Sequence, residues 1–157
     1  MTDFRCLPIE IETVERFRTT GRDDRNGELR VRSPGPDSRC PCRSCLHYAR
    51  DGEAVLLGSY NLPRPQGVSW TPSPVFVHAS PCERYDGINE IPEIVRGAFV
   101  SVRAYDAEDQ CLYDLGHVGD GTEVDEPLQR ALTDKRTAYV NIHTAKPGCL
   151  LCRVELC

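Results

Sequence analysis

The sequence predicts an α+β fold: a mostly antiparallel sheet of about six short strands, one main helix and long proline-rich loops. Three observations indicate this class. Short apolar stretches recur between turn residues, one segment has a clear helical stripe, and twelve prolines and twelve glycines interrupt the 157 residues. Many short strands beside a single firm helix are typical of antiparallel α+β proteins.

The strands are expected where apolar residues run together or alternate between loops. Phe99 to Tyr105 is the clearest strand, and Asp106 to Gln110 reads as the hairpin turn to its partner at Cys111 to Val118. The other expected elements are strands at 45–49, 54–60, 75–78, 138–144 and 150–156, and a helical turn at 93–97.

Residues 122–134 form the expected main helix. Thr122 is a suitable N-cap, and Val124, Leu128 and Leu132 fall on one stripe after it.

The length of the chain fits one domain. Residues 28–157 are expected to form it, with long loops at 33–41 and 61–74, where prolines accumulate. Residues 1–27 are poorly patterned, and we expect an edge strand followed by a mobile polar segment there.

Composition excludes several classes of partner. The net charge of −5 argues against nucleic acid and anionic membranes, because both need a basic surface. No apolar run approaches the roughly 20 residues of a transmembrane helix, and no secretory signal follows Met1. We therefore expect a cytoplasmic protein, whose nine cysteines stay reduced and act as core, metal-binding or catalytic residues.

Two short cysteine clusters, Cys40-Pro-Cys42-Arg-Ser-Cys45 and Cys149-Leu-Leu-Cys152, are the strongest chemical signal. Tetrahedral zinc takes four Cys or His ligands, often from two such pairs. The alternative metal-binding interpretation therefore draws its ligands from Cys40, Cys42, Cys45, Cys149 and Cys152, together with His143.

Strand geometry weakens the second pair, because residues three apart on a strand point to opposite faces. Cys152 shares its face with apolar neighbours, so core packing is the commoner explanation for its thiol. His78 and Cys82 are further residues that could complete a metal site.

Two strands carry polar residues on one face, with His143 and Arg103 at the centres. A solvent-facing sheet is the ordinary explanation. The functional alternative is a cleft shared with Cys149, six residues beyond the histidine, where a thiolate beside an imidazolium or guanidinium becomes nucleophilic. Arg43, next to Cys42, could hold an anion there.

Four motifs follow one another along the chain: Pro41-Cys42-Arg43 followed by Leu46, and the stretches Ser73–Val77, Ser101–Asp106 and Ala138–Cys149. Through these motifs the chain resembles, over roughly residues 28–157, the family called domain of unknown function 1203. The resemblance implies a fold and a site in a small bacterial protein, not a reaction. It implies that the site residues are Cys42, Arg43, Arg103, Tyr105, Asp106, His143 and Cys149. The chain departs from the family at Thr144, where the family usually has Asn.

Three functions remain open. The first is an enzyme, or a degenerate enzyme, acting on a small polar or anionic metabolite, with the reaction class undetermined. The second is a structural or regulatory zinc protein, and the third is an interaction module with inert thiols. In the enzyme, Cys149 is the nucleophile or a metal ligand, His143 the general base and Cys42 a second thiol, with Arg43, Arg103 and Tyr105 binding the substrate.

Overall fold

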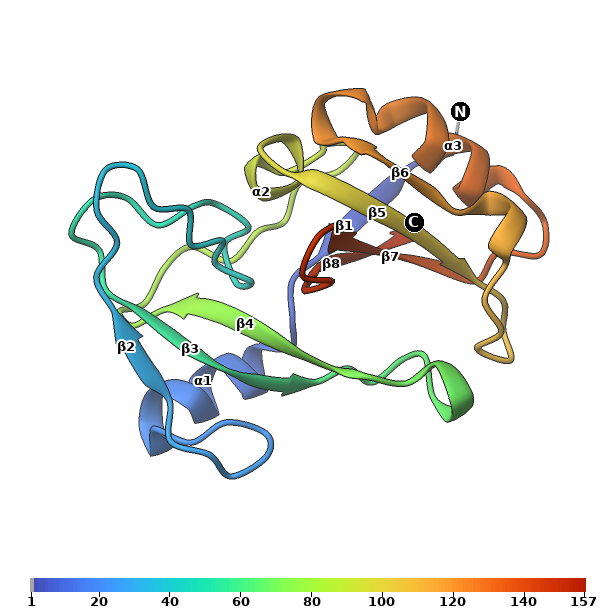
Figure 1. Ribbon diagram of the computed structural model, residues 1–157. Helices are drawn as coiled ribbons and strands as arrows, with labels where there is room; N and C mark the ends of the chain where they lie inside the picture. Colours follow the sequence, from blue (N-terminus) through green and yellow to red (C-terminus); the bar gives the residue numbers. More distant parts are fainter. Residues whose placement is uncertain (1) are drawn as a thin grey trace.

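The computed structural model, which describes residues 2–157, contains two antiparallel sheets and three α-helices (Figure 1). The larger sheet has the strand order β1-β8-β7-β5-β6, and the smaller has the order β2-β3-β4. The strands of the larger sheet are β1 (Phe4–Leu7), β5 (Phe99–Tyr105), β6 (His117–Asp120), β7 (Tyr139–Thr144) and β8 (Leu150–Leu156). Those of the smaller sheet are β2 (Arg30–Arg32), β3 (Val55–Asn61) and β4 (Pro72–His78).

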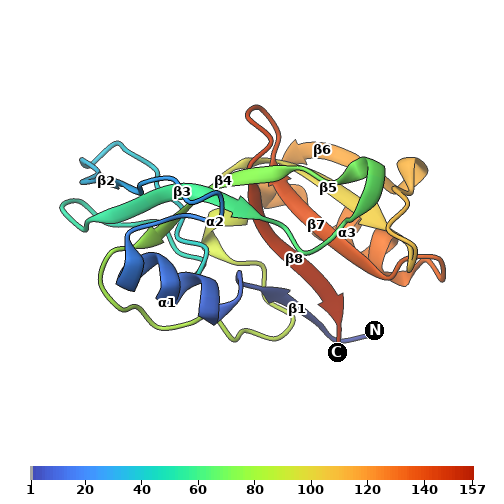
Figure 2. The ribbon, with the colours of Figure 1, turned by 90° about the horizontal axis from the view of Figure 1, so that it is seen from below.

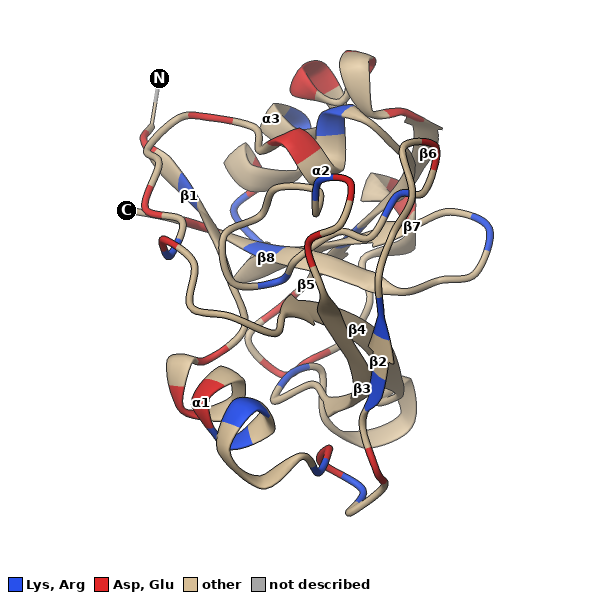
Figure 3. Cartoon of the chain, turned by 90° about the vertical axis from the view of Figure 1, so that its left-hand side faces the viewer, with Lys and Arg blue, Asp and Glu red and all other residues tan. Residues whose placement is uncertain are grey.

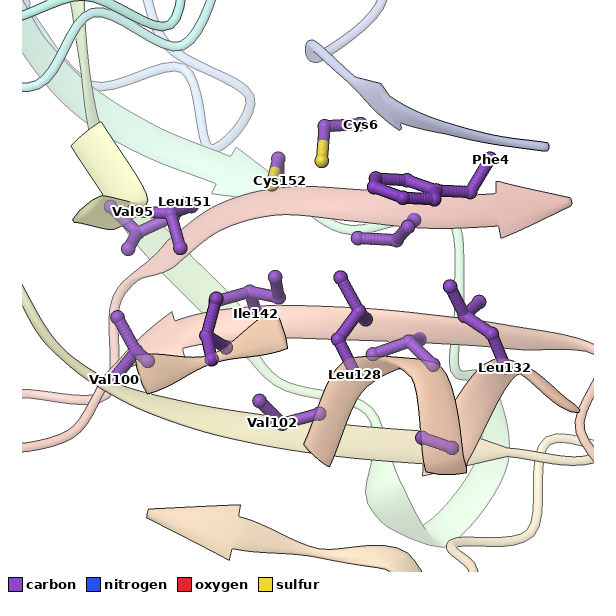
Figure 4. Close-up of a cluster of buried hydrophobic side chains, with 14 of the residues drawn as sticks. Phe4, Cys6, Val95, Val100, Val102, Leu128, Leu132, Ile142, Leu151 and Cys152 are labelled. Atoms are coloured by element: carbon purple, nitrogen blue, oxygen red, sulfur yellow. The ribbon is translucent and has the colours of Figure 1, made fainter. Parts of the chain in front are cut away.

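The larger sheet packs one face against α3 (Asp125–Thr133) and the short α2 (Glu93–Arg96). Leu128 and Leu132 of α3 lie over the apolar face of β5 and β7, where Val102 and Ile142 point toward them (Figure 4). Alternation along the strands explains this face, because every second residue of a strand points the same way.

The smaller sheet has its own apolar layer, formed with α1 (Ile11–Thr20), which lies beneath β3 and β4 (Figure 2). Val14 and Phe17 of this helix are fully buried, in the same cluster as Val75 and Val77 of β4. The helix ends at Gly21, whose φ of 68° is a left-handed conformation that glycine adopts without strain.

The α+β class and the antiparallel pairing are confirmed, but the details differ from the expectation. The described part of the chain has eight strands in two sheets instead of about six in one, and α1 and α3 are of similar length. The edge strand expected in the N-terminal segment is β1, which pairs with β8, but the helix α1 follows it where a mobile polar segment was expected. The expected strand at 45–49 is a turn, and the partner of β5 begins only at His117, after a single 3₁₀ turn.

Acidic and basic residues are interspersed along the elements (Figure 3). Within residues 2–157, every helix is too short or too polar to cross a bilayer.

Candidate metal centre

The loop that carries Cys42 runs along the end of β4, and this contact places the first ligand. Cys42 forms a parallel bridge with Phe76, and the N–H of Arg43 donates to the Phe76 carbonyl over 2.9 Å. The N–H of His78 then donates to the Cys42 sulfur over 3.3 Å. The loop thus acts as a short extra strand that brings a thiol beside the last residue of β4.

A tight turn brings Cys45 to the same side as Cys42. The N–H of Leu46 donates to the Cys42 carbonyl over 2.9 Å, and Leu46 has a left-handed φ of 58°. Such a φ is costly for a branched side chain and persists only where the surroundings enforce it. Here complete burial of the Leu46 side chain in the core of the larger sheet holds the turn.

Two further ligand atoms come from the end of β4 and the segment after it. The Sγ atoms of Cys42, Cys45 and Cys82 and a ring nitrogen of His78 all lie within 4.8 Å of one another. The Cys42 and Cys82 sulfurs are 3.8 Å apart, and the Cys45 sulfur is 3.5 Å from Nδ1 of His78. With Zn–S of about 2.3 Å and Zn–N of about 2.05 Å, the edges of a zinc tetrahedron are about 3.8 Å for S–S and about 3.5 Å for S–N. The S–S distance and the S–N distance in the structure each match the corresponding edge.

Hydrogen bonds among the three cysteines shift their pKa values in opposite directions. Hydrogen bonds from the Cys45 and Cys82 thiols, together with backbone N–H groups, hold the pKa of Cys42 far below its usual range. The same bonds raise the pKa of Cys45 and of Cys82, because those two thiols act as donors. Metals bind cysteine as the thiolate, so a ligand thiol has to lose its proton. The lowered pKa of Cys42 favours this form at one of the three sulfurs.

Outer contacts orient these ligands. The Arg18 guanidinium donates to the His78 carbonyl over 3.0 Å and to the Cys82 sulfur over 3.5 Å. Nε2 of His78 is buried without a hydrogen-bond partner and lies 3.6 Å from Oε1 of Glu53, too far for a hydrogen bond. A metal on Nδ1 places the proton on Nε2, facing this carboxylate, which is the usual arrangement around a metal-bound histidine.

The four residues differ in exposure. Cys42 is fully buried, and Cys45 and His78 are nearly so, whereas Cys82 is half-buried. A surface hollow of about 430 Å³ opens beside the group, and Cys45, His78 and Cys82 form part of its lining. The site is therefore a sheltered cluster with one accessible sulfur.

The remaining cysteines of the expected zinc set lie outside this group. Cys40 packs with Ala49 and Val55 in a small separate cluster. Cys152 is buried beside Cys6 in the core of the larger sheet (Figure 4), as strand alternation predicted. Cys149 is half-buried in the β7–β8 turn, where its N–H donates to Oγ1 of Thr144 over 2.9 Å. The metal group takes Cys42 and Cys45 from the expected zinc set, and His78 and Cys82 are the further residues that the sequence offered to complete a metal site.

The arginines and the histidine expected to form an anion site lie outside the metal group. This arginine is buried, and its Nε and Nη1 donate to the carbonyls of Leu150 and Pro41, each over 2.6 Å. Burial lowers the Arg43 pKa to about 10, so it stays charged at neutral pH. His143 is also buried, and its Nδ1 lies 3.0 Å from the Gly148 carbonyl. Burial first, and then the charge of Arg103, lower the pKa of His143 to about 4, so the ring is neutral.

The face of β7 that was expected to meet solvent is buried. Tyr139 and Asn141 are each 1% exposed. The segment after β3 covers them: the Asn141 amide donates to the Arg64 carbonyl over 3.3 Å, and the Arg64 guanidinium lies 4.3 Å from the Tyr139 ring centre. Tyr105 stacks on Tyr139 with ring centres 5.2 Å apart.

The comparisons with known proteins give one match. The family model described as "Protein of unknown function (DUF1203)" matches residues 39–155, a span that includes all four residues of the metal group. No curated protein and no solved structure matches the chain.

Proposed function

This chain belongs to the DUF1203 family, and we propose that it is a zinc protein in which Cys42, Cys45, His78 and Cys82 bind one Zn²⁺ ion. The carrying observation is the agreement of two measured edges, 3.8 Å and 3.5 Å, with those of a Cys₃His zinc tetrahedron. Cys₃His is a common structural set, and its four protein ligands leave no open position for a substrate.

The metal's role is to hold together segments that have little regular structure. The ligands come from the 40–47 loop, the end of β4 and the irregular stretch between β4 and α2. Without a metal, only packing and a few backbone hydrogen bonds fix these segments. A structural zinc ion contributes roughly 10–16 kcal/mol to the folding of small zinc peptides at pH 7. Even a fraction of that value is large beside the marginal stability of an ordinary domain.

Metal analysis of the purified chain tests the proposal. We expect about one zinc per chain, in agreement with a single four-ligand site, and we expect Cys82→Ala to lose most of it. Cys111→Ala is the matched control, because Cys111 is also half-buried but lies outside the metal group. A wild-type protein that holds no zinc after expression in zinc-supplemented medium overturns the proposal.

Chelation provides a second readout. A strong chelator should lower the melting temperature of the wild type and of Cys111→Ala, and added zinc should restore it, because a ligand bound only by the folded state stabilises that state. Cys82→Ala should melt at the lower temperature with or without the chelator. Equal melting curves for the wild type before and after chelation would contradict a structural role.

A second candidate function, an enzyme acting on a small anionic metabolite, has one specific observation in its favour. The neutral imidazole of His143 lies near the positive charges of Arg103 and Arg43, and a neutral imidazole can act as a general base. In this reading Cys149 is the nucleophile. One fast-reacting thiol at neutral pH, lost in Cys149→Ala, supports this function, and uniformly slow thiols refute it.

We further propose a cytoplasmic location, since all nine cysteines are free thiols, as in a reducing compartment.

A further inference from the structure

We propose that the metal centre is also a site of oxidation by hydroperoxides: Cys82 is oxidised, forms a disulfide with Cys42, and the zinc ion is released. This inference rests on the proposed zinc binding. It assigns to Cys82 a chemical role that a purely structural ligand does not have.

Access points to Cys82 as the reacting sulfur. Cys42 is fully buried and Cys45 is 6% exposed, whereas Cys82 is half-buried and forms part of the lining of the 430 Å³ hollow. A hydroperoxide is small enough to enter such a hollow, and oxidation of cysteine follows thiolate character and exposure. The Arg18 guanidinium lies 3.5 Å from the Cys82 sulfur, and a cysteine that binds zinc does so as the thiolate.

The chemistry balances with the hydroperoxide as the only oxidant. The Cys82 thiolate attacks the terminal oxygen of ROOH, the O–O bond breaks, and the departing alkoxide takes a proton to become ROH. Cys82 is then a sulfenic acid, which condenses with a neighbouring thiol. The Cys42 thiolate attacks the Cys82 sulfur, and the expelled hydroxide takes a second proton to become water. Two thiolates lose two electrons in total, and ROOH is reduced to ROH and water.

The distance between the two sulfurs suits the second step. They are 3.8 Å apart, so a disulfide bond of about 2.05 Å requires an approach of about 1.8 Å. Cys82 can supply this movement because it lies in a stretch without helix or strand. The disulfide leaves only Cys45 and His78 as ligands, and two ligands do not hold zinc as four do.

The experiment treats the zinc-loaded full-length protein with hydrogen peroxide. A chromophoric chelator follows zinc release, and mass spectrometry after blocking of free thiols identifies the cross-link. We expect zinc release together with a Cys42–Cys82 disulfide, and we expect dithiothreitol with added zinc to restore the metal. A cross-link between other cysteines, or release without any disulfide, overturns the proposal.

Two variants sharpen the test. Cys82→His keeps four ligands of a kind that zinc accepts but removes the accessible sulfur, so peroxide should release its zinc at least about tenfold more slowly. Cys111→Ser removes another half-buried thiol outside the centre and should behave like the wild type. If Cys82→His does not load zinc, the cross-link mapped in the wild type decides alone.

The two proposals fail in different ways. If the untreated protein contains no zinc, the proposed function itself is wrong. If it contains zinc that peroxide neither releases nor replaces with the Cys42–Cys82 disulfide, the centre is a zinc site without this redox chemistry.

Discussion

Arg43 lies in the 40–47 loop, between the proposed ligands Cys42 and Cys45, and links this loop to the larger sheet. Its Nε donates to the Leu150 carbonyl at the start of β8, and its Nη1 to the Pro41 carbonyl, each over 2.6 Å. The side chain is 2% exposed, so water does not replace these bonds when they are lost. We therefore predict that Arg43→Met, which keeps much of the volume but removes every donor, destabilises the fold.

The magnitude follows from the two bonds. A hydrogen bond from a charged donor is worth about 1.5–3 kcal/mol, so the pair contributes about 3–6 kcal/mol. Methionine has no guanidinium to desolvate, and this offsets part of the loss. We expect a net loss of about 3–4 kcal/mol, and a melting temperature lower by about 6–16 °C for a chain of this length.

Urea unfolding followed by circular dichroism measures the loss, with zinc added in excess so that metal content does not vary. Arg32→Met is the control, because Arg32 is exposed on the edge strand β2 and donates only to its neighbour Val31. That change should stay within about 0.5 kcal/mol. If Arg43→Met also loses less than about 1 kcal/mol of unfolding free energy, the two hydrogen bonds of Arg43 do not stabilise the fold as argued. The guanidinium is then free for the anion binding that the sequence suggested.

Three further predictions concern the outer contacts and the fold. Glu53→Gln should lower zinc affinity about tenfold in competition with a chromophoric chelator, because outer-shell carboxylates orient a metal-bound histidine such as His78. His143 has a folded pKa of about 4 against about 6.5 when unfolded, so the unfolded state binds the extra proton between these values. Acidification from pH 7 to 4 should therefore destabilise the wild type by about 3 kcal/mol more than His143→Gln, which has no imidazole to protonate. Gly121→Ala should lower the melting temperature sharply, because its Cβ would lie 1.7 Å from a backbone carbonyl oxygen.

Two of these predictions have a matched control, and the third has an outcome that would contradict it. Glu83→Gln changes a carboxylate beside the same hollow and should leave zinc affinity unchanged. Gly35→Ala adds a methyl group with nothing within 4 Å and should leave the melting temperature unchanged. A pH-independent difference for His143→Gln would show that the buried ring does not resist protonation.

Local pattern predicted most strands of both sheets but missed the helix α1 and the short strand β2. The alternation in Phe99–Tyr105 and the apolar residues in Leu150–Leu156 were sufficient, and both strands have the expected bounds. In Ile11–Thr20, by contrast, Ile11, Val14 and Phe17 are apolar, and these three residues among charged and polar ones carry the whole helical signal. The strand β1 is stabilised by pairing with β8, a contact between opposite ends of the chain that no local window contains.

The metal group shows the same division between local and long-range information. The Cys42–Cys45 pair is visible in the sequence because its spacing alone indicates a turn with two thiols on one side. The second pair of ligands could be His78 and Cys82 or else Cys149 and Cys152. Which pair joins Cys42 and Cys45 depends on the strand that the 40–47 loop contacts. The contact of the loop with Phe76 makes that choice, since it sets His78, two residues farther along β4, against the Cys42 sulfur. Strand alternation correctly argued against Cys152, but only the pairing of two distant segments could identify what replaces it.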